Sequence, residues 1–119
     1  MNAYLARIGA ARPPQADPAT LRELQLRHLL TVPFENLSIH LGEPIVLEPG
    51  ALRDKLLRRR RGGFCYELNG AFAELLSTLG FQVTLLAARV FGDDGPGPPF
   101  DHLALRVDAA GSGPWLADV

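Results

Sequence analysis

Residues 61–80 read RGGFCYELNGAFAELLSTLG, and this stretch decides how the rest of the chain is interpreted. Its apolar residues recur every three or four positions, which is the spacing of one face of an α-helix. Gly80 comes directly after this pattern, and glycine in a left-handed conformation commonly ends a helix. The stretch therefore predicts a buried helix with Cys65, the only cysteine of the chain, in its first turn.

The residues before this stretch predict further helices. Asp17 and Pro18 are typical of a helix N-terminus, and the helix that they open is expected to end before Pro33. Residues 32–47 show no sustained period and predict an ordered irregular segment with room for a short strand; their apolar content indicates burial. A second short helix is expected to begin at Pro49.

The residues after Gly80 change to a pattern typical of strands. Residues 81–91 are rich in β-forming residues, and a loop of glycine, proline and aspartate follows at residues 92–99. Residues 102–107 alternate, which places His102 and Arg106 on the face opposite the leucines. A turn then leads into a strand at residues 115–119. The order predicts an α+β fold in which an antiparallel meander is built on helices.

Composition excludes several classes of protein. The chain has 119 residues, 47% of them hydrophobic, and a formal net charge of −1, so it can form one compact core and lacks a general nucleic-acid surface. The basic run at residues 58–61 either faces water or faces a phosphorylated cofactor. No segment approaches the roughly 20 apolar residues of a membrane span. With neither a signal-like segment nor an internal disulfide, the chain is expected to be cytoplasmic, and its excess of arginine over lysine suggests a GC-rich bacterial gene.

Cys65 is a candidate nucleophile because of its place at a helix N-terminus. A thiol attacks a carbonyl carbon as the thiolate, and both a helix N-terminus and a nearby imidazolium favour that charge. Gly62 and Gly63 permit a tight turn or unusual backbone angles and the close approach of a substrate, and the backbone amides there can bind an oxyanion. The alternative is a buried, inert cysteine.

His102 and Asp118 favour the catalytic interpretation. His102 follows a flexible loop, and Asp118 interrupts an apolar strand, where a carboxylate needs a partner. Orienting an imidazole would satisfy it. Arg89 or Arg106 would satisfy it equally well as a structural ion pair. His28 and His40 are weaker candidates, and a single cysteine with scattered histidines lacks the ligand spacing of a metal site.

The sequence resembles the arylamine N-acetyltransferase family at several motifs. The run Arg61 to Asn69, RGGFCYELN, resembles the nucleophile motif of that family, and VPFENL at residues 32–37 is a second match. Further matches occur near the start, at residues 88–90 and at residues 115–119, so that the resemblance runs through nearly the whole chain.

The resemblance implies a catalytic triad of Cys65, His102 and Asp118. In a ping-pong cycle, acetyl-CoA would acetylate the cysteine, and an arylamine, hydrazine or N-hydroxyarylamine would take the acetyl group. Phe34, Phe64 and Val90 would line the acceptor pocket, while Arg61, Glu67 and Asn69 match positions that are expected to be structural.

The resemblance also implies a domain organisation. Residues 1–82 would form a helical bundle that carries the cysteine, and residues 83–119 the first antiparallel strands of an incomplete β-barrel, with a cysteine-protease-like core. The family chain is more than twice as long, so we expect this one to be truncated after the triad aspartate, without the lid and most CoA contacts.

Three other functions remain compatible with the sequence. A related amide synthase would use the same triad to close a macrolactam, and a thiol hydrolase would pass the acyl group to water. A truncated fragment would be inactive or only a binding remnant. The sequence leaves the oligomeric state open.

Overall fold

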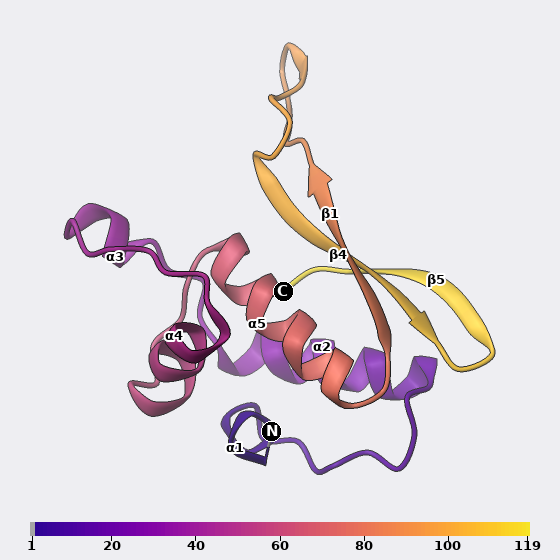
Figure 1. The fold of residues 1–119 in the computed structure, drawn as a ribbon. Helices are drawn as coiled ribbons and strands as arrows, with labels where there is room; N and C mark the ends of the chain where they lie inside the picture. The colour runs from indigo at the N-terminus through magenta and orange to yellow at the C-terminus, as the bar shows by residue number, and fades with distance from the viewer. Residues whose placement is uncertain (1) are drawn as a thin grey trace.

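The computed structural model describes residues 2–119 as an α+β chain in which helices come first and strands follow (Figure 1). The helical segments are α1 (Asn2–Arg7), α2 (Pro18–Thr31), α3 (Leu37–His40), α4 (Pro49–Arg53), the π-helical turn η1 (Asp54–Arg58) and α5 (Cys65–Thr78). The strands are β1 (Gln82–Ala88), β2 (Phe91–Gly92), β3 (Gly95–Pro96), β4 (His102–Ala109) and β5 (Ser112–Ala117).

Helix α5 is the central element of the fold. It packs against α4 on one side and against β1 and β4 on the other. The side chains of Phe72, Leu75 and Leu76 are fully buried, as their helical spacing predicts. The helix ends at Thr78, and Gly80, two residues later, has a φ of +100°, a conformation that favours glycine.

The predicted boundaries of α2 are confirmed. The Asp17 carboxylate accepts a hydrogen bond of 2.8 Å from the backbone N–H of Thr20, and Pro18 occupies the first turn. The helix ends at Thr31, before Pro33. Leu21 and Leu24 are buried on its inner face.

The main sheet is antiparallel, open and three-stranded, in the order β1-β4-β5. In its register, Ala88 lies opposite His102 and Leu105 lies opposite both Leu85 and Ala117. Along β4, Leu103, Leu105 and Val107 are buried and Arg106 is exposed, as the predicted alternation requires. Ala104, which the alternation predicts on the same face as Arg106, is buried as well. Within residues 2–119 the strands do not close into a barrel, and β2 and β3 form a small separate pair.

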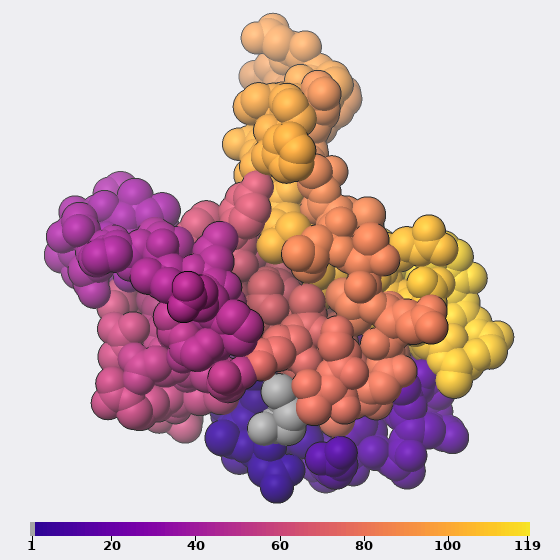
Figure 2. Space-filling model, viewed as in Figure 1, coloured from indigo at the N-terminus to yellow at the C-terminus, as the bar shows by residue number. Residues whose placement is uncertain are grey.

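The prediction that residues 32–47 are buried is wrong for most of the segment, although Val32 belongs to the core. The segment holds the short helix α3, and its β pairing is a single bridge between Phe34 and Gly63. Figure 2 shows the segment as a lobe at the edge of the molecule. It is attached largely through polar contacts, and six of its large apolar side chains are 45–69% exposed: Phe34, Leu37, Ile39, Leu41, Val46 and Leu47.

Helix α1 has no counterpart among the predicted elements, yet it contributes Tyr4 and Leu5 to the core. The Tyr4 hydroxyl bonds His28 Nε2 at 2.8 Å, and the His28 ring also contacts Phe72. Among residues 2–119, no helix is long and apolar enough to cross a membrane.

We predict that His28 destabilises the protein in mild acid. Burial lowers the pKa of His28 from 6.5 to about 4, and its Nδ1 has no hydrogen-bond partner. The unfolded chain therefore takes up a proton before the folded chain does. The contribution of the neutral His28 to the free energy of unfolding is fully present above pH 6.5. It is lost as the pH falls to about 4, and the total loss is about 3 kcal/mol.

The test compares urea unfolding of the wild type and His28→Gln across this pH range. The wild type should lose more stability than the variant. Parallel curves for the two proteins would contradict the assignment of this loss to His28.

Candidate active site

Cys65 is the first residue of α5, and its side chain is buried. Phe64, just before it, has extended backbone, and its N–H donates to Glu67 Oε1 at 3.2 Å. The other backbone N–H groups of the first turn lack partners within the helix. A negative charge on Cys65 or on a group bound to it is stabilised at this end of the helix dipole.

Gly62 and Gly63 serve close packing. Neither has a positive φ, so neither uses the left-handed conformation that glycine permits. Residues 33–35 pass directly beside them, with the Glu35 N–H donating to the Gly63 carbonyl at 2.9 Å. A Cβ on Gly62 would lie 1.8 Å from the Pro33 carbonyl oxygen, and one on Gly63 2.8 Å from the Glu67 side chain.

Two ion pairs hold the segments around the cysteine. Lys55 Nζ lies 2.7 Å from Glu67 Oε2, with both side chains buried, and it also donates to Ser38 at 2.9 Å. Arg61 bonds Glu35 at 2.8 Å. This guanidinium lowers the pKa of the Glu35 carboxyl, chiefly through its hydrogen bond. The structural roles expected for Arg61 and Glu67 agree with these contacts.

The basic run is divided between two environments. Arg58 and Arg59 pair with Asp54 on the surface, and the Arg58 side chain is 75% exposed. Arg61 instead points into the contacts with Glu35 and Glu43 and is 24% exposed. The interpretation of the run as a solvated face therefore fits Arg58 and not Arg61.

His102 and Asp118 form a pair. His102 begins β4. Asp118 directly follows the end of β5, so the prediction that it interrupts a strand is wrong. His102 Nε2 lies 2.7 Å from Asp118 Oδ2. Because a carboxylate accepts, Nε2 carries the proton in this bond, which leaves Nδ1 free to act as a base.

The alternative partners of Asp118 make other contacts. Arg106 lies 3.6 Å from Asp108, and Arg89 donates to the Gly97 carbonyl. The geometry therefore agrees with the prediction that Asp118 pairs with a histidine and not with an arginine.

Asn69 links this pair to the helix that carries Cys65. Its Nδ2 donates to Asp118 Oδ1 and to the Leu103 carbonyl, each at 2.9 Å. Residues four apart lie on the same face of a helix, so Cys65 is one turn from Asn69 on the side that meets β4. The Tyr66 hydroxyl donates to the Phe100 carbonyl at 2.5 Å and ties the same turn to the residues before His102. In the described residues no hydrogen bond joins Cys65 directly to His102.

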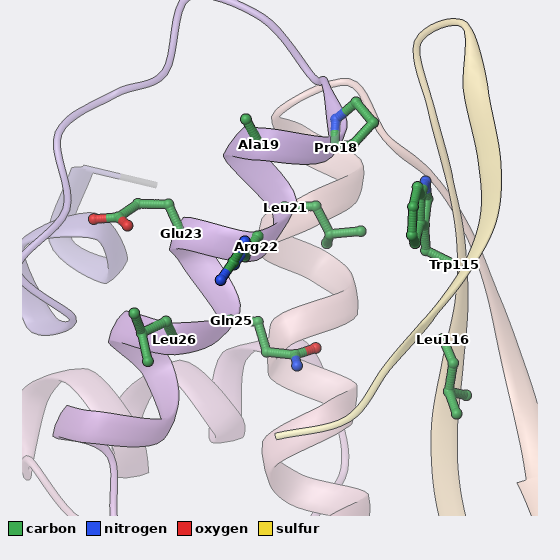
Figure 3. Close-up of a pocket in the computed structure, with 9 residues that line it drawn as sticks. All are labelled: Pro18, Ala19, Leu21, Arg22, Glu23, Gln25, Leu26, Trp115 and Leu116. Atoms are coloured by element: carbon green, nitrogen blue, oxygen red, sulfur yellow. The ribbon is translucent and has the colours of Figure 1, made fainter.

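The residues predicted for an acceptor pocket lie on three segments. Phe34 is 65% and Val90 55% exposed, while Phe64 is half-buried against the Tyr66 ring. A groove of about 550 Å³ lies elsewhere, between α2 and β5, with Trp115 and Leu116 on its strand side (Figure 3). Among residues 2–119, no group of histidine, cysteine and acidic side chains has the arrangement of a metal site.

Gln25 also belongs to this region, although nothing in the sequence marks it as functional. It lies on α2, and its Oε1 accepts a hydrogen bond of 3.2 Å from the backbone N–H of Asp118. A polar residue on a partly exposed helix face gives no sequence signal of such a contact.

Comparison with known proteins identifies the family. The N-acetyltransferase family model matches residues 17–119. The chain belongs to the arylamine N-acetyltransferase family. It is 43% identical to the arylamine N-acetyltransferase of Mycolicibacterium smegmatis, over all of this chain and 45% of that protein. It is 41% identical to the Escherichia coli K12 enzyme, over all of this chain and 42% of that protein.

Solved structures of arylamine N-acetyltransferases have the same fold in the matched region. The Salmonella typhimurium structure gives a TM-score of 0.93 at 40% identity, over 99% of this chain and 43% of that one. A Mycobacterium marinum structure in complex with CoA gives a TM-score of 0.90 at 40% identity, over 98% and 45%. The chain thus spans less than half the length of these relatives.

We predict that Gly62→Ala disrupts the site. The new methyl group would collide with the Pro33 backbone, so we expect a loss of about 3 kcal/mol or more in unfolding free energy. Gly50→Ala is the matched control, because nothing lies within 4 Å of its added Cβ. Urea unfolding of both variants measures the difference. Equal stabilities would contradict the packing role of Gly62.

We predict that Lys55→Met alone leaves a buried, uncompensated Glu67 and costs about 3–5 kcal/mol. The double variant Lys55→Met, Glu67→Gln should recover part of this loss. It leaves no charge unpaired, and its new amide oxygen can still accept from the Phe64 N–H. Arg58→Ala, which breaks a surface pair, should change stability little. In urea unfolding, a double variant no more stable than Lys55→Met would refute this account of the pair.

Proposed function

We propose that this chain carries the catalytic triad of an arylamine N-acetyltransferase, formed by Cys65, His102 and Asp118. The observation that supports it most is the His102–Asp118 pair, which the Asn69 amide joins to the helix that begins at Cys65. Family membership adds to this support, because the relatives are named for the same activity.

In the first half-reaction, Cys65 attacks the thioester carbonyl of acetyl-CoA as the thiolate. His102 Nδ1 holds the proton taken from the thiol, and Asp118 stabilises the resulting imidazolium through Nε2. The new S–C bond forms as the S–C bond to CoA breaks, and His102 returns the proton to the departing CoA thiolate. Backbone N–H groups at the start of α5 stabilise the oxyanion.

In the second half-reaction, the amine attacks the acetyl group on Cys65. His102 takes a proton from the amine nitrogen, the S–C bond breaks, and Cys65 is regenerated. Arylamines, hydrazines and N-hydroxyarylamines are the proposed acceptors, and Phe34, Phe64 and Val90 the proposed aromatic and apolar wall.

Acetyl-CoA is the proposed donor. A thiol at the N-terminus of a helix that Asn69 joins to the His102–Asp118 pair fits its thioester group, and the relative from M. marinum was solved in complex with CoA. We expect most contacts with CoA itself to lie beyond Val119. The division into a helical part at residues 1–82, with a cysteine-protease-like core, and the first strands of a barrel at residues 83–119 belongs to the same proposal.

Intact-mass analysis tests the proposal. After mixing with acetyl-CoA, the wild-type chain should gain one acetyl group and lose it when an arylamine is added. Cys65→Ala should gain none, and Asp118→Asn should gain it at least about tenfold more slowly, because His102 loses its charged partner.

Two outcomes would contradict the proposal. One is a wild-type chain without an adduct. The other is an adduct that disappears at the same rate with and without the amine, which would indicate hydrolysis.

A further inference from the structure

The segment that carries Asp118 lies beyond the strand ladder. The pairing of β5 with β4 ends at Ala117, opposite Leu105. Asp118 itself is 45% exposed in its side chain. An exposed carboxylate has several open rotamers, and an exposed ion pair contributes little to fixing one of them. Other groups must hold this side chain toward His102.

Asn69 supplies the first of these groups. It is fully buried, and its side-chain amide contacts both Asp118 and Val119. Its Nδ2 donates to Asp118 Oδ1 at 2.9 Å, and its Oδ1 accepts from the backbone N–H of Val119 at 3.0 Å. Because Oδ1 of Asp118 is engaged, Oδ2 is the oxygen directed at His102 Nε2.

Gln25 supplies the second. Figure 3 shows its side chain extending from α2 toward the side of the groove that faces β5. Its Oε1 accepts the backbone N–H of Asp118 at 3.2 Å. The side chain of Asp118 is thus held from α5 and its backbone from α2.

We propose that Asn69 and Gln25 are positioning residues that orient Asp118 for its role in the triad. The inference rests on the proposed function and extends it to two residues outside the triad. Asn69 acts on the carboxylate and Gln25 on the backbone, so that the loss of either lets Asp118 turn away from His102.

A purely structural role for the same contacts is the alternative. Asn69 also donates to the Leu103 carbonyl and so attaches β4 to α5. Stability measurements alone would not separate the two roles. The reactivity of the Cys65 thiol separates the two roles, because that reactivity depends on the imidazole that Asp118 orients.

The test measures the rate of Cys65 alkylation by iodoacetamide in the 119-residue chain at about pH 6 and about pH 9, where an ordinary thiol reacts far more slowly at the lower pH. The variants are Asn69→Leu and Gln25→Met, which remove the hydrogen bonds and keep similar volumes. Asp118→Asn gives the effect of losing the carboxylate. Tyr4→Phe is the control, because it removes a buried hydrogen bond that does not touch Asp118.

We expect the ratio of the two rates, low pH over high, to fall about tenfold in Asn69→Leu and several-fold in Gln25→Met, approaching Asp118→Asn. Tyr4→Phe should lower stability and keep the wild-type ratio. Gln25 is partly exposed, so that its variant remains informative if Asn69→Leu does not fold.

Wild-type ratios in both variants, with stability lowered as in Tyr4→Phe, would overturn the inference. So would a wild-type Cys65 that reacts like an ordinary thiol. A ratio that depends on Asn69 and Gln25 in a chain that acetyl-CoA does not acetylate would instead reject the proposed transferase and leave the positioning role intact.

Discussion

The hydrogen bonds of the buried Asn69 amide fix how the strands lie on the central helix, and the geometry of the candidate site depends on them. The amide reaches Leu103 on β4 and both residues that follow β5. An amide buried at this position must satisfy its polar atoms, so the contacts are specific as well as stabilising. They bring elements distant in sequence to the turn at which Cys65 begins α5.

The other end of that turn is held by charge and by close packing. The Lys55–Glu67 pair is buried, and Glu67 also accepts from Phe64, so one carboxylate serves both the ion pair and the helix start. Gly62 lets residues 33–35 pass against this region at a distance that no side chain allows. Most residues of the motif around Cys65 therefore have structural roles, and Cys65 itself is the candidate nucleophile.

Much of this arrangement follows from the sequence because it depends on local pattern. Asp17 and Pro18 predict the start of α2, apolar spacing predicts α5, and alternation predicts β4. The pairing of Asp118 with a histidine follows from the need of a carboxylate for a partner, although only the geometry distinguishes histidine from arginine in that role.

The remainder depends on tertiary contacts that no local pattern carries. Residues 32–47 are apolar enough to suggest burial, yet among residues 2–119 most of their large apolar side chains are left uncovered, and Phe34 is 65% exposed. The Gln25 contact spans 93 positions of sequence and uses an ordinary helix residue. The role of Gly62 is misjudged from sequence because a glycine pair suggests unusual backbone angles, whereas the constraint is the passing Pro33 backbone.

If the fold brings Cys65 beside the His102–Asp118 pair, a short bifunctional reagent should join the cysteine to the histidine. 1,3-Dibromoacetone alkylates a thiol and then a nearby imidazole, and peptide mass spectrometry identifies the two residues that it joins. The expected product is a cross-link from Cys65 to His102 that is absent in His102→Gln. A cysteine that is modified but joined to no histidine, or joined to His40, would contradict it.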